Sequence, residues 1–266
     1  MAERTKFDVV IVGGGHNALV AATVIARAGR SVLVLERRAE PGGAAVSVSP
    51  FPGVDARLSR YSYLVSLLPR QIVDELGLDF SVARRRIASY TPVPGTDRGV
   101  LIDAEDPAHT RAALGDDFAG WEELYGRTAR AARAIFPTLL EPLPSREALR
   151  RAVGDDEAWD ALVERPIGEA IEAAVADDVV RGIVLTDALI GTFARADEPS
   201  LRQNRCFLYH VIGNGTGRWD VPVGGMGALT AALARAAERA GADVRTASPV
   251  VAIRAGERRV EVETAD

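Results

Sequence analysis

Cysteine is nearly absent from this sequence: Cys206 is the only one in 266 residues. A disulfide framework within the chain, a Cys-x-x-Cys redox pair and a thiolate zinc site are therefore excluded. Enzymes that relay electrons through a redox disulfide form a class to which this chain cannot belong. We interpret Cys206 as a buried structural thiol, the common role of a single cysteine.

An excess of positive charge and a long apolar run are also missing. The formal net charge is -5, and no basic stretch alternates with aromatic residues, so we expect no nucleic-acid partner. No segment approaches the length of a membrane span, and the apolar run near the start is too short for a secretory signal. We therefore expect a cytoplasmic protein, and peripheral contact with a membrane stays open.

No catalytic constellation stands out. The sequence offers no carboxylate pair and no metal-ligand spacing, so we assign neither a catalytic residue nor a metal site. His16 and His210 lie close to glycine-dense stretches and could face a ligand, but ordinary core or surface histidines are the alternative. His109 falls at an expected helix start, where a surface position is the simplest interpretation.

What the chain does contain, over residues 7–36, is the pattern of a strand, a glycine turn, a helix and a second strand. The apolar run Val9–Val12 leads into three consecutive glycines and then into alanine-rich helical sequence, and a second apolar run ends on Glu36. This order is that of a dinucleotide-binding βαβ unit. A tight turn that binds nothing is the alternative, but the complete context favours a dinucleotide site.

Each position of this pattern has a physical role. Gly13 permits the turn out of the strand, and Gly15 lets the backbone approach a pyrophosphate. Ala18 takes the third glycine position and is small enough for close packing of helix and strand. The helix directs free N–H groups and its positive dipole end at the phosphates. Glu36 lies about 20 residues further on, where its carboxylate can accept hydrogen bonds from ribose hydroxyls.

A second small-residue block follows the ribose position. Arg37 and Arg38 come first and indicate either further cofactor contacts or a solvated loop. Pro41 then begins a turn. The run that follows brings backbone close to a ligand a second time, through Gly42, Gly43, Ala44 and Ala45.

The remainder predicts an α/β protein with a helical insertion. Residues 67–77 predict a helix, and residues 80–104 predict short antiparallel strands, one of them at 99–102. From about 107 to 196, apolar residues recur at helical spacing, and acidic residues precede several of the helices. A helix over 228–241 and strands over 250–253 and 260–262 complete the chain.

Five blocks in this order resemble the phytoene desaturase-like branch of the flavin amine-oxidoreductase superfamily. They read DVVIVGGGHNALVAA, VLERRAEPGGAA, SRYSYLVSLLPRQI, SYTP and VPVGGMGALTAALARAAERAGADV. The resemblance is strong over 7–94 and 205–253 and loose in the helical middle. It implies FAD in an extended form, held by a Rossmann-like domain into which a mainly helical substrate domain is inserted.

The resemblance also implies a cofactor-binding set. Gly13, Gly15 and Asn17 would lie at the pyrophosphate. Glu36 would bind the adenosine ribose, with Arg38 along the same edge. We also include their neighbours Gly14, Ala18 and Arg37 in the expected cofactor-binding set. Gly42, Gly43, Ala44 and Ala45 would pass beside the pyrophosphate or flavin, and the backbone of Val250 would pair with the adenine. Many family members carry arginine at the position of Ala44, so one charge contact is absent here.

The implied organisation is a FAD-binding domain in two parts, 1–75 and 219–266, around a substrate domain over 76–218. Family members add a late glycine-containing segment that covers the flavin. Because this sequence lacks it, we expect a truncated chain with an incomplete second part.

The implied activity is that of a FAD-dependent oxidoreductase which removes hydride from a small lipophilic substrate, of carotenoid or polyisoprenoid type or related. Three alternatives stay open: a flavin amine oxidase of the same superfamily, a non-catalytic or truncated FAD-binding module, and a dehydrogenase that uses only a nicotinamide cofactor. A homo-oligomer and a complementing C-terminal chain are the partners that we consider.

Overall fold

The computed structural model describes residues 6–215, 217 and 219–265. The chain divides into two compact units. The first unit comprises Met1–Val65, Pro69–Ala83 and Val221–Asp266, and the second comprises Ser66–Leu68 and Arg84–Asp220. Each unit is described by itself.

A three-stranded parallel sheet forms the base of the first unit. Its order is β1 (Val9–Val12), β2 (Val32–Leu35) and β9 (Asp243–Arg245). Val9 pairs with Val32, and Leu33 pairs with Asp243. The predicted strand–turn–helix–strand unit is therefore confirmed, whereas β9 was not predicted, because three residues give too short a pattern.

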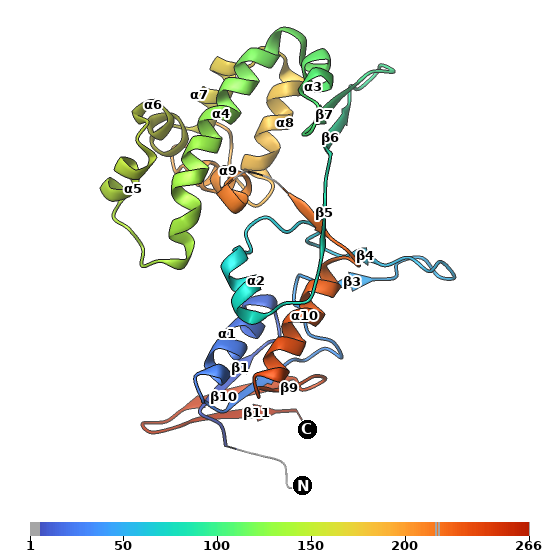
Figure 1. Cartoon of the computed structure of the whole chain (residues 1–266), viewed down its shortest axis with the longest axis vertical. Helices are drawn as coiled ribbons and strands as arrows, with labels where there is room; N and C mark the ends of the chain where they lie inside the picture. Colours follow the sequence, from blue (N-terminus) through green and yellow to red (C-terminus); the bar gives the residue numbers. More distant parts are fainter. Residues whose placement is uncertain (1–5, 216, 218, 266) are drawn as a thin grey trace. The chain divides into compact units, whose positions relative to one another are not determined.

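Two alanine-rich helices, α1 (His16–Arg27) and α10 (Met226–Arg239), pack against each other next to this sheet (Figure 1). Small side chains at their contact allow the helices to approach closely. The buried cluster contains Ala22, Ala26, Val32, Val34, Ala237 and Ala242. Residues separated by about 200 positions in the sequence thus share one core.

The rest of the first unit consists of short elements. The hairpin of β3 (Ser47–Val48) and β4 (Leu58–Ser59) is antiparallel, as are β10 (Val250–Ala255) and β11 (Val260–Thr264). The predicted helix after residue 67 is α2 (Arg70–Leu76), and Gly77 ends it in the left-handed conformation, with a φ of 61°.

Two of the boundaries between the units, after Ala83 and after Asp220, fall in paired strands. β5 (Val82–Arg84) pairs with β8 (Asp220–Pro222). This pairing was not predicted, because the partner of β5 lies far along the chain. Only β6 (Ile87–Pro92) and β7 (Gly99–Asp103) form the predicted local hairpin.

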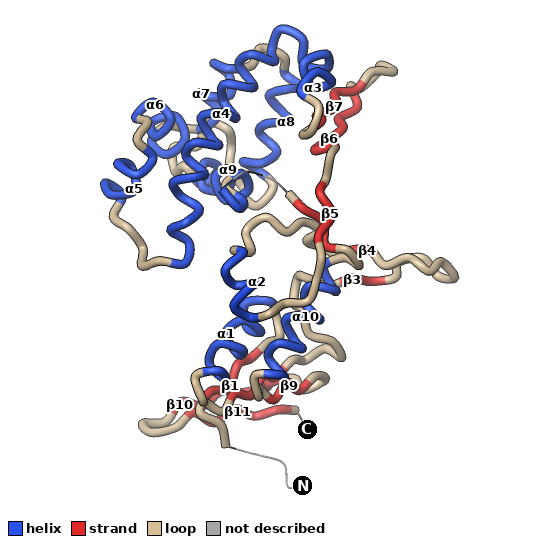
Figure 2. Tube along the Cα trace, in the orientation of Figure 1, coloured by secondary structure: helices blue, strands red, loops and turns tan. Residues whose placement is uncertain are grey.

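The second unit is mainly helical, as Figure 2 shows. Its helices are α3 (Pro107–Leu114), α4 (Phe118–Ile135), α5 (Arg146–Val153), α6 (Asp156–Trp159), α7 (Ile167–Ala174), α8 (Asp178–Leu189) and α9 (Arg202–Val211). Three 3₁₀ turns are η1 (Gly115–Asp117), η2 (Phe136–Leu140) and η4 (Gly213–Gly215), and η3 (Asp160–Glu164) is a π-helical turn. The pattern did not predict α9, because glycines follow it closely.

Aspartates begin several of these helices, as predicted from the acidic residues that precede them. Asp106 accepts a hydrogen bond from the N–H of Ala108 (3.0 Å), and Asp155 accepts one from Ala158 (2.9 Å). Asp177 accepts N–H groups from the first turn of α8. Each carboxylate satisfies helix N–H groups that would otherwise lack partners.

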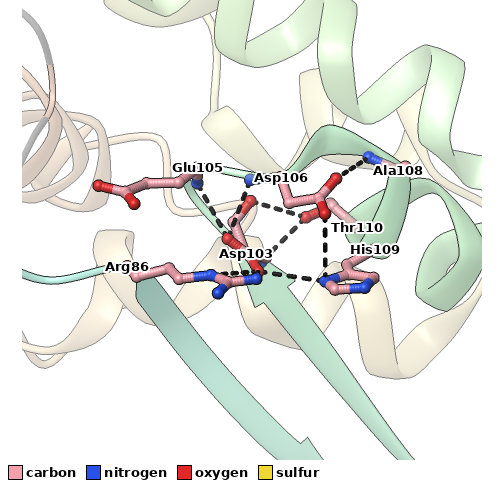
Figure 3. Close-up of polar contacts among 7 residues, drawn as sticks. All are labelled: Arg86, Asp103, Glu105, Asp106, Ala108, His109 and Thr110. Atoms are coloured by element: carbon pink, nitrogen blue, oxygen red, sulfur yellow. Dashed lines mark hydrogen bonds and ion pairs between the residues drawn. The ribbon is translucent and has the colours of Figure 1, made fainter.

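A buried carboxylate fixes the junction between β7 and α3 (Figure 3). The side chain of Asp103 has no exposed surface and pairs with the guanidinium of Arg86 at 2.9 Å. It also accepts the N–H groups of Glu105 and Asp106, both at 3.0 Å. The hydrogen bond from Arg86 outweighs burial and holds the pKa of Asp103 well below its usual range.

The neighbours of Asp103 complete the junction. Thr110 donates its hydroxyl to the backbone carbonyl of Asp103 (3.0 Å) and accepts the N–H of that residue (2.9 Å). His109 lies with Nδ1 3.3 Å from the Asp103 carboxylate (Figure 3). Because His109 is largely exposed and serves this ion-pair cluster, its role is structural.

A second carboxyl group, that of Asp187 on α8, behaves in the opposite way. Burial raises the pKa of Asp187 to about 6, and the nearby His210 and the Tyr125 hydroxyl only partly oppose this shift. Burial and the charge of Asp187 in turn raise the pKa of Tyr125. The folded second unit therefore binds a proton at Asp187 more tightly than an unfolded chain does.

This difference predicts how stability depends on pH. Because the folded pKa is raised, Asp187 contributes stability that is present below pH 4 and lost as the pH rises through about 6. Asp187→Asn should reduce the loss of unfolding free energy between pH 4 and 7 by about 1–3 kcal/mol. All three tryptophans lie in the second unit, so urea titrations followed by tryptophan fluorescence report on it.

Glu172→Gln, at an exposed position of α7, is the matched control and should keep the wild-type pH dependence. An identical pH slope in Asp187→Asn and wild type would contradict this account of Asp187.

Candidate functional site

The predicted glycine turn leads from β1 into α1. Gly13 has a φ of 93°, which side-chain-bearing residues rarely adopt, and its N–H donates to the carbonyl of Leu35 (2.8 Å). Gly15 is the N-cap of α1 and has an extended conformation, with a φ of -72°. The chain thus turns sharply at Gly13 and enters the helix at Gly15.

The N-terminus of α1 is open to an anion. No side chain among the described residues caps it, and its first turn contains no acidic residue. A Cβ atom at Gly15 would lie more than 4 Å from the surrounding atoms of the described residues, so space for a ligand lies directly beside the backbone. His16 and Asn17 occupy the exposed first turn, and Ala18 follows, partly buried. Free N–H groups, the helix dipole and open space together favour a phosphate group.

The second small-residue block lies directly against this turn. The N–H of Gly42 donates to the carbonyl of Gly14 (2.8 Å), and Gly15 and Gly42 form an isolated parallel bridge. Gly43 has a φ of 59°, and a Cβ there would lie 3.3 Å from the Cα of Gly15. The structure therefore brings the two predicted glycine blocks together.

The block continues along α10. The hydroxyl of Thr230 donates to the carbonyl of Ala45, which is buried, whereas Ala44 is exposed. The start of α10 is held by the hairpin that follows: Ser47 accepts the N–H of Gly227 (3.0 Å), and Ser59 accepts that of Met226 (3.1 Å). These bonds fix the course of the block relative to the helix.

Glu36 has a role that the sequence did not reveal. Its side chain is buried, with 7% of the residue exposed, and one carboxylate oxygen accepts the N–H of Gly14 at 2.7 Å. The other oxygen accepts the N–H of Arg38 at 2.9 Å. Because a carboxylate offers about four acceptor sites, capacity remains for ribose hydroxyls.

The segment after Glu36 joins the site to β10. The carbonyls of Glu36 and Arg38 accept the N–H groups of Ser248 (2.9 Å) and Ala247 (2.7 Å). Val250 begins β10 two residues beyond Ser248 and is partly buried. The side chains of Arg37 and Arg38 are exposed at this edge. The predicted set is thus contributed by neighbouring segments of the first unit.

The histidine and cysteine candidates lie outside this set of polar contacts. His16 is exposed, and His210 lies in the second unit with its Nδ1 2.9 Å from the carbonyl of Cys206. Cys206 is partly exposed, so the prediction of a buried thiol was wrong. Among the residues that the structure describes, no three His, Cys, Asp or Glu side chains converge on a metal position, and no helix is both long and apolar enough to cross a membrane.

Comparison with known proteins relates the chain to two curated relatives. It is 54% identical over 259 residues to an uncharacterised protein of Mycobacterium tuberculosis, covering 93% of this chain and 48% of that one. It is 29% identical over 287 residues to the mouse pyridine nucleotide-disulfide oxidoreductase domain-containing protein 2, covering 94% and 49%. The chain therefore spans about half the length of the curated relatives it matches.

The fold agrees with these relationships. A solved structure of a putrescine oxidase variant superimposes with a TM-score of 0.61 at 22% identity, over 97% of this chain and 54% of that one. Residues 11–70 match the model of the NAD(P)-binding Rossmann-like domain. The α/β class and the Rossmann-like fold predicted from the sequence are thereby confirmed: residues 11–70 resemble the NAD(P)-binding Rossmann-like family, and the chain is similar to one half of pyridine nucleotide-disulfide oxidoreductase domain-containing protein 2.

Proposed function

We propose that the first unit binds FAD and that the protein is an oxidoreductase which removes hydride from a lipophilic substrate. The observation that carries the proposal is the bridge between Gly15 and Gly42 beside the open N-terminus of α1. One glycine turn suffices for a phosphate. The second glycine block lies against the first and provides further backbone that a ligand can approach closely. Such a surface suits a longer cofactor.

The residues present fit such a cofactor. The N–H groups at the start of α1 would hold the diphosphate, and Asn17, in the first turn of that helix, would lie next to it. Glu36 would accept ribose hydroxyls while it keeps its two backbone bonds, and Val250 would offer backbone groups to the adenine. When bound, FAD supplies a ring that accepts a hydride from a C–H bond, and the protein contributes positioning and exclusion of water.

Two other enzyme functions compete with this proposal. Oxidation of an amine is one alternative, which the sequence resemblance leaves open; the likeness to putrescine oxidase, at 22% identity, concerns the fold only. A dehydrogenase that uses only a nicotinamide cofactor is the other, and the carboxylate of Glu36 would then favour NAD, because it would repel a 2′-phosphate. The second glycine block favours FAD over a nicotinamide cofactor alone.

A third alternative is a flavin-binding module without turnover. It is motivated by the chain's covering only about half of its relatives' length. Complementation by the remaining sequence would then restore activity.

The cofactor and the chemistry are tested together. Purified protein should be yellow, and the small molecule released on denaturation should have the mass and spectrum of FAD. Release of a nicotinamide nucleotide would overturn the proposal. Anaerobic bleaching of the flavin by polyisoprenoid or terpenoid hydrocarbons, but not by an amine panel, would support the hydride-removal reading, and the reverse pattern would favour the amine oxidase.

A pair of glycine substitutions separates cofactor binding from folding. Gly15→Ala places its Cβ in open space at a backbone conformation that alanine adopts, so the melting temperature without cofactor should stay unchanged. The added methyl would occupy the approach to the diphosphate, and FAD affinity should fall by about tenfold or more. Calorimetric titration and thermal melts measure the two effects.

Gly42→Ala is the matched variant. Its Cβ would meet Val46 Cγ1 at 2.5 Å at a φ of 144°, so it should lower the melting temperature even without cofactor. Wild-type FAD affinity in Gly15→Ala would remove the glycine turn from the proposed site.

A further inference from the structure

The imidazole of His210, on α9, is held in one tautomer. Its Nδ1 lies 2.9 Å from the backbone carbonyl of Cys206, one turn earlier on the same helix. A carbonyl oxygen only accepts hydrogen bonds, so Nδ1 carries the proton of the neutral ring. Nε2 is then an acceptor, and none of the described residues donates a hydrogen bond to it. The ring therefore presents an acceptor in a fixed orientation.

A carboxyl group lies close to this imidazole. Asp187 belongs to α8, which packs beside α9 (Figure 1), and its side chain lies near the His210 ring and the Tyr125 hydroxyl. Burial raises the pKa of Asp187 to about 6, so the carboxyl group is protonated in mildly acidic solution and then donates a hydrogen bond. A donor on Asp187 and an acceptor on His210 are together complementary to a hydroxyl group.

Exposed apolar side chains lie next to these two polar groups. Gly191 lies beside the imidazole, since a Cβ atom there would be 4.0 Å from Cε1 of His210. Close to Gly191 in the chain, Ile190 and Phe193 are exposed. Tyr209 is also exposed, and its ring centroid lies 5.8 Å from that of His210. Such a surface suits a ligand that is apolar except for one hydrogen-bonding group.

We propose that His210 and Asp187 bind the hydroxyl group of a lipophilic alcohol, whose hydrocarbon part lies against Ile190, Phe193 and Tyr209. The hydroxyl would donate to Nε2 of His210 and accept from the carboxyl group of Asp187. The inference rests on the proposed function for the lipophilic nature of the substrate, and it narrows that class to alcohols. A hydrocarbon would leave both polar groups without partners, which weakens its binding.

Titration of the whole chain with three matched ten-carbon terpenoids tests this site. They are the alcohol geraniol, the hydrocarbon myrcene and the amine geranylamine. Tryptophan fluorescence reports binding, because all three tryptophans lie in the second unit. At about pH 6, geraniol should bind at least about tenfold more tightly than the other two. In histidine-selective NMR spectra, geraniol should shift the Nε2 signal of His210 and leave those of His16 and His109 unchanged.

Variants of α9 separate the hydrogen bond from the apolar contact. His210→Phe keeps a ring without Nε2 and should lower geraniol affinity by about tenfold, to the level of myrcene. His210→Gln supplies an amide in place of the ring nitrogen and should recover part of this loss. Arg205→Gln, at an exposed position of the same helix, is the matched control and should bind geraniol as the wild type does.

Equal affinity of the wild type for geraniol and myrcene, or binding of neither, would overturn the inference. Preference for geranylamine would also overturn it, because the site would then recognise a cation. If His210→Phe does not fold, an unchanged His210 Nε2 signal in wild-type protein saturated with geraniol contradicts the inference. Flavin content is measured on the same sample, so a missing FAD would overturn the proposed cofactor while the geraniol titration still decides the site.

Discussion

The first unit depends on the burial of the Glu36 carboxylate between two backbone N–H groups. Removing a carboxylate from water is costly unless it is hydrogen-bonded, and charge-assisted bonds to Gly14 and Arg38 provide that compensation. The backbone of Glu36 also bonds to Arg245 and Ser248. One residue therefore ties the glycine turn and the end of β2 to the segment that leads into β10. We propose that the same carboxylate meets the ribose, and cofactor binding would then be linked to the shape of the turn.

A contrast between two packed helices explains why the cofactor would bind at α1. The start of α10 is held by the hydroxyls of Ser47 and Ser59, which satisfy its N–H groups from within the chain. At the start of α1 no side chain of the described residues provides a cap, and the second glycine block passes beside it. Helix N–H groups without an intramolecular acceptor can bind an anionic ligand. Of these two helices, α1 is therefore the one whose N-terminus is suited to a phosphate group.

Local features of the fold could be predicted from the sequence. The unit of β1, α1 and β2, the helix that ends at Gly77 and the β6–β7 hairpin all follow from apolar periodicity and turn residues within short windows. The pairing of β5 with β8, the strand β9 and the bridge from Gly15 to Gly42 could not, because each depends on a distant partner. The candidate residues could be predicted individually. The hydrogen bonds from the N–H groups of Gly14 and Arg38 to the Glu36 carboxylate could not, because they form only in the folded chain and no sequence pattern indicates them.

The central claim is that the two glycine blocks form one cofactor-binding surface. Residue-resolved hydrogen–deuterium exchange with and without FAD tests it most directly. The account predicts that FAD slows exchange together at residues 13–17 and 42–45, with no comparable change in the helices of the second unit. Saturable binding of FAD with protection confined to one block, or located in neither, would contradict it.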